Sequence, residues 1–275
     1  MDLKSYDIIL INTSAGKDSL AMSDHVVEMA KEQDVADRVA AVHCDLGRVE
    51  WAGTKELAHR QCLRYGLTLH VVKRPQGDLL QHVAARGKWM GPGNARYCTS
   101  DHKRDRVNVL ITALVGAWNA KHQSHLRVKA RRAVRVLNCM GMRAQESPDR
   151  AKLAVLERNE RTSSSVRVVD NWLPIHDWTE AQVWDLIRSR GLEYHPAYDL
   201  GMPRLSCVFC FYAPQEALKL AGYHNPELLQ EYVDVERRIN HDFKHKQPII
   251  QIQQALQAGW VPQGKVDGTL WSQCA

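Results

Sequence analysis

The sequence predicts an α/β fold: a doubly wound, mostly parallel sheet of five strands with a C-terminal helical extension. Short runs of branched apolar residues alternate with amphipathic stretches, as in a parallel sheet covered on both faces. Beyond residue 213 the pattern is helical only. At 275 residues the chain is long enough to bury a large core. We expect an α/β domain over residues 1–213 and the extension over residues 214–275.

The apolar runs set the expected elements. We expect strands over residues 8–11, 39–44, 67–72, 134–140 and 166–169, and helices over residues 50–65, 101–120, 179–190, 215–221, 226–240 and 248–258. Thr179 is the predicted N-cap of its helix, with Gln182 in the capping-box position. Ligands of parallel sheets bind at the carboxyl ends of the strands, where Ser14–Ser19 and Asp45 fall.

Composition limits the class of protein. The chain is 44% hydrophobic and 25% charged, as is usual for globular proteins. No apolar run approaches membrane-spanning length, and the N-terminus has no signal-peptide core. We therefore expect a cytoplasmic protein without a membrane partner. Seven cysteines, an odd number in a chain that is neither small nor secreted, favour thiols or a metal centre over disulfides.

A loop of small and polar residues, Ser14–Ser19, separates the first strand from a helix-like pattern. Backbone N–H groups and the positive helix end can bind a phosphate there. Lys17 adds a point charge, and Ser14 and Ser19 add hydroxyl groups. The spacing is not that of the Walker P-loop. An ordinary strand-to-helix turn is the alternative.

The sequence Ser14-Ala15-Gly16-Lys17-Asp18-Ser19 resembles the SGGKDS loop of the PP-loop ATP pyrophosphatases, with Ala15 where those enzymes usually have glycine. If that position needs a positive φ, alanine is strained there. Later segments resemble the phosphoadenosine-phosphosulfate reductase family in the family's order: Gly141–Ser147, Pro174–Thr179, and Tyr198–Gly201 followed by Cys207 and Cys210. The resemblance covers about residues 6–213.

The resemblance implies an adenine nucleotide alpha-hydrolase-like fold and a set of nucleotide-binding residues. That set is Ser14, Ala15, Gly16, Lys17, Asp18, Ser19, Asp45, Gly141, Arg143 and Glu146. Lys17, Asp18 and Arg143 are the expected catalytic residues, because Lys17, Arg143 and Mg²⁺ would neutralise a departing pyrophosphate.

Three acidic residues of this set have a second interpretation. Asp18 either steers Mg²⁺ or stabilises the first helical turn. Asp45 either lies near the nucleotide or caps a turn. Glu146 either orients Arg143 or caps the following helix.

Cys98, Cys207 and Cys210 form the metal site that the resemblance implies. A [4Fe–4S] cluster with one open iron position would suit sulfur delivery; zinc, or reactive thiols without a metal, are the alternatives. Cys139 is either a fourth ligand or a small core residue.

Lys17 favours ATP cleavage over binding of an adenylated sulfate, since pyrophosphate carries the charge to be neutralised. The chain also ends without the Cys-Gly-Ile/Leu-His motif of thioredoxin-dependent reductases. The leading hypothesis is an ATP pyrophosphatase that adenylates an acceptor for sulfur incorporation. The chain resembles the ATP-pyrophosphatase component of DNA phosphorothioation, which implies a nucleic-acid acceptor. Transfer RNA is the alternative acceptor.

The alternatives are an adenylyl-sulfate or phosphoadenylyl-sulfate reductase and a non-catalytic nucleotide sensor. The basic residues of 121–135 suit a nucleic-acid acceptor, or form an ordinary solvated surface. A cysteine desulfurase is the candidate sulfur donor. The sequence is compatible with a homodimer and does not fix the oligomeric state.

Overall fold

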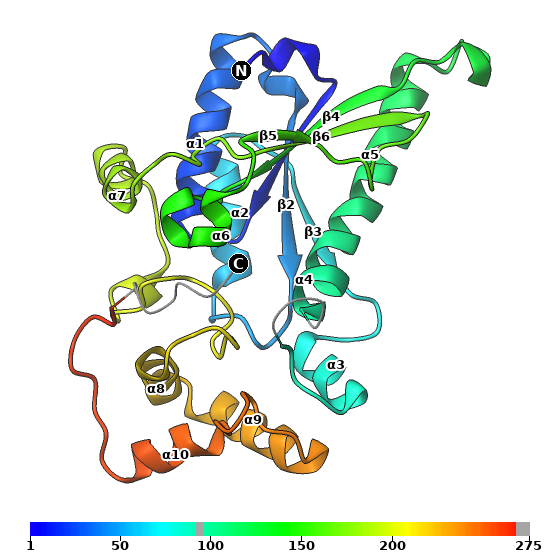
Figure 1. Ribbon diagram of the computed structural model, residues 1–275. Helices are drawn as coiled ribbons and strands as arrows, with labels where there is room; N and C mark the ends of the chain where they lie inside the picture. The colour runs from blue at the N-terminus through cyan, green and yellow to red at the C-terminus, as the bar shows by residue number, and fades with distance from the viewer. Residues whose placement is uncertain (92–95, 268–275) are drawn as a thin grey trace. The chain divides into compact units, whose positions relative to one another are not determined.

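The computed structural model describes residues 1–91 and 96–267. Its sheet has six strands in the order β3-β2-β1-β4-β6-β5 (Figure 1). The strands are β1 (Ile8–Thr13), β2 (Val39–Asp45), β3 (Leu69–Lys73), β4 (Val134–Met140), β5 (Leu156–Arg158) and β6 (Arg167–Trp172). β1 pairs in parallel with β2 on one side and with β4 on the other, so the chain connections run from β1 toward both edges of the sheet. This divergence creates a switch point at the carboxyl end of β1, where ligands of such sheets bind.

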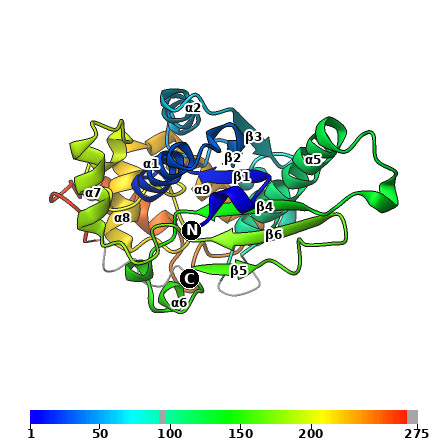
Figure 2. The ribbon, with the colours of Figure 1, turned by 90° about the horizontal axis from the view of Figure 1, so that it is seen from above.

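The expectation of five strands is wrong by one. β5 is a sixth strand that pairs antiparallel with β6 at the edge of the sheet. Figure 2 shows β1, β4, β6 and β5 following one another in that order. All three residues of β5 are exposed, so the strand has no apolar alternation that the sequence could reveal. β6 also extends to Trp172, beyond the expected residues 166–169.

Alternate residues of β1 enter two separate cores, as the period of two in a strand requires. Ile9 and Ile11 pack with the helices α1 (Lys17–Glu32), α2 (Thr54–Arg64) and α7 (Glu180–Ser189). Ile8 and Leu10 pack with α5 (Asp105–His122). Figure 1 shows α1, α2 and α7 on one side of the sheet and α5 on the other. The doubly wound arrangement is therefore confirmed.

The chain divides into two compact units. Unit 1 comprises residues 1–44, 55–72 and 105–194; unit 2 comprises residues 45–54, 73–104 and the chain from His195 onward. Unit 2 holds α3 (Leu79–Arg86), α4 (Tyr97–Thr99), α8 (Gln215–His224), α9 (Pro226–Ile239) and α10 (Ile250–Gln257). The domain boundary after residue 213 stays a prediction.

The core of unit 2 is aromatic. The rings of Trp89 and Tyr232 stack with centroids 5.2 Å apart, and Phe243 meets Trp89 edge-on at 5.1 Å. The helices of residues 215–221, 226–240 and 248–258 are confirmed with small shifts of their ends. α3 was not expected, although Asp78 and Gln81 form a capping box at its start.

Short elements complete the described chain. α6 covers Pro148–Ala151, a π-helical turn Ser100–Arg104 precedes α5, and 3-10 turns cover Leu3–Ser5, Ala36–Arg38, Val128–Ala130, Ala144–Glu146 and Pro196–Tyr198. In the part of the chain that the structure describes, none of the helices combines the length and apolar character needed to span a bilayer.

Candidate nucleotide-phosphate site

The loop after β1 has the geometry of a tight strand-to-helix turn. Ala15 has a φ of +58°, so the condition raised by the sequence is met: this position is left-handed, and alanine fills it. Such a conformation costs about 1–2 kcal/mol for a residue with a Cβ. The Ser14 N–H donates to Ser19 Oγ at 3.1 Å, and the Ser19 hydroxyl donates to the Gly16 carbonyl at 2.9 Å. The two serines thus hold the loop in shape.

Lys17 is the first residue of α1, and its side chain is only 2% exposed. Its Nζ lies 3.6 Å from Asp18 Oδ2 and 3.5 Å from Glu180 Oε1. A buried ammonium group requires such carboxylate partners because its own hydration is lost. The loop therefore holds a cation at the start of a helix, where an anion is also favoured.

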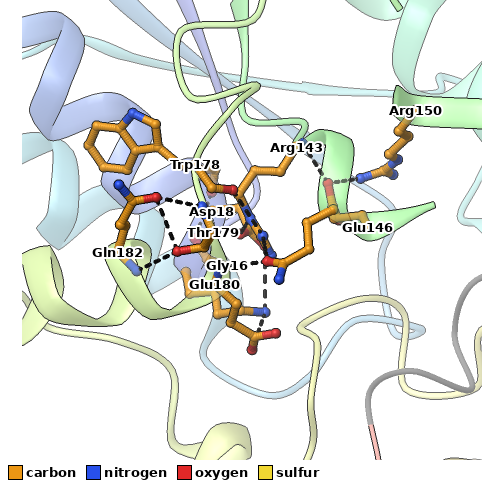
Figure 3. Close-up of polar contacts among 12 residues, drawn as sticks. Gly16, Asp18, Arg143, Glu146, Arg150, Trp178, Thr179, Glu180 and Gln182 are labelled. Carbon is orange, nitrogen blue, oxygen red and sulfur yellow. Dashed lines mark hydrogen bonds and ion pairs between the residues drawn. The ribbon is translucent and has the colours of Figure 1, made fainter. Parts of the chain in front are cut away.

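Arg143 follows β4 and brings a second buried cation to the loop (Figure 3). Its Nε donates to Asp18 Oδ1 at 2.6 Å, and its Nη1 donates to Gln145 Oε1 at 2.9 Å. Asp18 is thus the shared counter-ion of Lys17 and Arg143. A guanidinium group that is held in one orientation suits bidentate binding of phosphate oxygens.

Glu146 positions Arg143 through the backbone. The Arg143 N–H donates to Glu146 Oε2 at 2.9 Å, and Arg150 forms an ion pair with the same carboxylate. Ser147, and not Glu146, caps α6, because its Oγ accepts from the Arg150 N–H. Of the two sequence interpretations of Glu146, the orientation of Arg143 agrees with these contacts.

Gly141 is required by the close approach of β4 to α1. A Cβ at this position would lie 2.9 Å from the carbonyl oxygen of Asp18 and 3.0 Å from the Cα of Ser19. Both neighbours are backbone atoms, so neither can move aside cheaply. The absent side chain lets the Arg143 segment reach the loop.

Asp45 ends β2, and its Oδ1 accepts from the Gly47 N–H at 2.8 Å. This contact is the turn-capping alternative. A nucleotide-binding role of Asp45 stays a prediction.

Cys98, Cys207 and Cys210 all belong to unit 2 and are near enough to influence one another electrostatically. Burial raises the pKa of the Cys98 and Cys207 thiols, with a smaller contribution from the Cys210 thiol, so both are protonated at neutral pH. Metal binding needs thiolates. Within residues 1–91 and 96–267, no three His, Cys, Asp or Glu side chains are arranged to hold a metal ion.

The ligand set of Cys98, Cys207 and Cys210 stays a prediction. Cys139 is fully buried in the core of unit 1, where burial raises the pKa of its thiol. The C-terminal Cys274 lies outside the described residues.

The basic stretch of residues 121–135 is partly structural. Arg132 forms a two-pronged ion pair with Asp7, with both distances 2.6 Å, and its guanidinium lies over the Trp118 ring. Arg135 lies over the Tyr6 ring. Lys121, Arg127 and Lys129 are exposed. A nucleic-acid contact would thus rest on the exposed members.

Sequence reasoning missed Gln145 and Glu180. Gln145 accepts from Arg143, and Glu180 pairs with Lys17. The two residues are 35 positions apart, yet Gln145 Oε1 also accepts from the Glu180 N–H at 2.7 Å. Gln145 is a variable position within its motif, and an acid in the first turn of a helix is usually explained by the helix dipole. No signal in the sequence separated these residues from that ordinary explanation.

Comparison with known proteins identifies the family of this chain. The sequence model of one protein family, the phosphoadenosine phosphosulfate reductase domain, matches residues 8–213. An uncharacterised 37.8 kDa protein of Escherichia phage 186 is 26% identical over 186 residues, which cover 66% of this chain and 50% of that protein. This chain therefore spans about half the length of that relative.

A phosphoadenosine 5'-phosphosulfate reductase of Gloeobacter violaceus is 25% identical over 201 residues, covering 73% of this chain and 70% of that enzyme. A crystal structure of a variant of Candida glabrata FMN adenylyltransferase superposes with a TM-score of 0.51 at 12% identity, covering 74% of this chain and 56% of that one. The structural likeness concerns the fold alone. The family match spans most of the chain, and the chain belongs to the phosphoadenosine phosphosulfate reductase domain family.

Proposed function

We propose that this protein is an ATP pyrophosphatase that adenylates an acceptor for sulfur incorporation. The observation that carries the proposal is Lys17, a buried ammonium group in the phosphate loop beside the Asp18–Arg143 ion pair. Two buried cations can stabilise a leaving group that gains negative charge during the reaction, and pyrophosphate is such a group.

In the proposed reaction an acceptor oxygen attacks the α-phosphorus of ATP. The bond from that phosphorus to the bridging oxygen breaks, and pyrophosphate leaves with the electron pair. Lys17 and Arg143 stabilise the charge on the leaving group, with Mg²⁺ as a further cation. Asp18 keeps both side chains in place, and Glu146 fixes the backbone from which Arg143 projects. Hydrosulfide then attacks the adenylated atom of the acceptor, the bond from that atom to the AMP oxygen breaks, and AMP leaves with the electron pair.

The proposed acceptor is a nucleic acid, as in DNA phosphorothioation or RNA thiolation. The exposed Lys121, Arg127 and Lys129 support it, because each can replace a counterion of a phosphate backbone. A cysteine desulfurase is the proposed sulfur source. A [4Fe–4S] cluster at Cys98, Cys207 and Cys210 would hold hydrosulfide when bound. We assign no step to it, because the described side chains are not arranged as ligands.

A reductase of adenylyl-sulfate or phosphoadenylyl-sulfate is the second candidate. The family match and the Gloeobacter violaceus relative favour it. It would reduce a bound adenylated sulfate to sulfite and leave ATP uncleaved.

The deciding experiment incubates the protein with ATP, Mg²⁺, inorganic sulfide and short DNA or RNA, and separates the nucleotide products. We expect AMP and pyrophosphate, and at least a hundredfold lower rate in Lys17→Ala, because loss of one preorganised charge costs about 3 kcal/mol or more. Lys152→Ala is the matched control, since Lys152 is an exposed lysine that pairs with Asp149. Release of ADP and orthophosphate would exclude the mechanism. Sulfite release from phosphoadenylyl-sulfate with thioredoxin, without ATP cleavage, would favour the reductase.

A further inference from the structure

Glu180 is the first residue of α7 and contacts the phosphate loop with its side chain. Its Oε1 lies 3.5 Å from Lys17 Nζ, and the Glu180 side chain is 50% exposed. Among the described residues, Lys17 is the group that this carboxylate pairs with. Asp18, the second partner of Lys17, is bound more closely to Arg143, at 2.6 Å. Of these two carboxylates, Glu180 is therefore the one that can leave Lys17 more readily.

The backbone of Glu180 is fixed independently of its side chain. Its N–H donates to Gln145 Oε1 at 2.7 Å, and the same oxygen accepts from Arg143 (Figure 3). The capping box of Thr179 and Gln182 holds the start of α7. A rotation of the Glu180 side chain into solvent would therefore break neither contact, and the carboxylate would remain near the favourable positive end of α7.

We propose that Glu180 is an exchangeable counter-ion of Lys17, which the pyrophosphate part of a nucleotide displaces. This inference rests on the proposed function, because it assumes that pyrophosphate binds at Lys17. Without a ligand, Glu180 helps neutralise an ammonium group that has lost its hydration. When the phosphates arrive, they repel the carboxylate and take its place. Glu180 is thus a positioning residue that weakens the binding of pyrophosphate and speeds its release.

The size of the effect follows from the exposure of the pair. Water screens the half-exposed Glu180 carboxylate, so a ligand that displaces it from Lys17 loses only a small part of its affinity. We therefore expect Glu180→Gln to bind pyrophosphate and ATP about two- to fivefold more tightly. The affinity for AMP, which lacks the β- and γ-phosphates, should not change.

The test is calorimetric titration of the full chain with inorganic pyrophosphate, ATP and AMP. Asp185→Asn is the matched control, because it removes the same charge from the same helix while Asp185 pairs with Arg188 and not with Lys17. Glu180→Asp is a second variant, whose shorter side chain keeps the charge but withdraws it from Lys17. We expect tighter pyrophosphate binding in both Glu180 variants and not in Asp185→Asn, with a smaller difference in 0.5 M salt as screening predicts.

Three results would overturn the inference: unchanged or weaker pyrophosphate binding in Glu180→Gln, equal tightening for AMP, or equal tightening in Asp185→Asn. These measurements require no turnover, so they are independent of the ATP-cleavage assay. A protein that binds pyrophosphate more tightly as Glu180→Gln but cleaves no ATP would support the counter-ion role and refute the proposed reaction. In an active enzyme, Glu180→Gln should lower the KM for ATP and lower kcat where pyrophosphate release limits turnover.

Discussion

Replacing Asp18 by asparagine tests the charge balance of the phosphate loop. The variant keeps an oxygen that Arg143 can donate to, but it removes the shared negative charge from two side chains that are 2% and 3% exposed. Breaking a buried ion pair costs about 3–5 kcal/mol when one charge is left uncompensated. Arg143 retains Gln145 at 2.9 Å, and Lys17 retains Glu180 at 3.5 Å. Because each cation keeps one partner, we expect a smaller loss of unfolding free energy, about 2 kcal/mol, which is typical of one hydrogen bond to a charged group.

Urea unfolding of the ligand-free protein, followed by circular dichroism, measures this loss of unfolding free energy. Asp149→Asn is the control, because Asp149 is 66% exposed and its pair with Lys152 should contribute less than about 0.5 kcal/mol. Saturating pyrophosphate should stabilise Asp18→Asn more than the wild type, since the anion replaces the missing charge. A loss below 0.5 kcal/mol in Asp18→Asn would refute the view that Asp18 neutralises two buried cations.

Two further predictions concern Gly141 and a buried histidine pair. Gly141→Ala should weaken ATP binding at least tenfold in a titration, because the new Cβ would lie 2.9 Å from a backbone oxygen of the loop; unchanged affinity would show that the loop can retreat. In unit 2, His82 Nδ1 lies 3.0 Å from His102 Nε2. Burial lowers the pKa of His102 to about 4. The charges of His82 and Arg74 lower this pKa further, whereas those of Asp101 and Asp78 oppose the shift. The contribution of His102 to the unfolding free energy should be fully present above pH 6.5 and should fall as the pH drops toward 4, because only the unfolded chain then binds the proton; between pH 7 and pH 5 the loss is about 2 kcal/mol. Equal urea midpoints at these two pH values would contradict it, and His102→Gln should show a smaller change.

The sequence predicts the parts of this fold that are set by local pattern. Apolar runs such as 8–11 and 134–140 were recognised because a buried parallel strand needs apolar residues on both faces. The start of α7 was recognised because Thr179 and Gln182 satisfy each other within one turn. β5 was missed because it is an exposed edge strand, and its pairing with β6 is a tertiary property.

The candidate site shows the same division. The loop of Ser14–Ser19 was recognised from contiguous residues. The roles of Gln145 and Glu180 depend on which segments the sheet brings together, and no local pattern encodes that. The left-handed conformation of Ala15 lies between these cases. The sequence indicated only that alanine would be strained if this position needs a positive φ, and the backbone does have a positive φ there.

Ala15 and Gly141 differ in a way that affects how such loops are found. At residue 15 a methyl group is accommodated at the expense of backbone strain, whereas at residue 141 the backbone of α1 already fills the space. A search pattern that demands glycine at residue 15 would therefore overlook this chain. A pattern that demands glycine after the fourth parallel-sheet strand, together with lysine at the first position of the first long helix, would detect it.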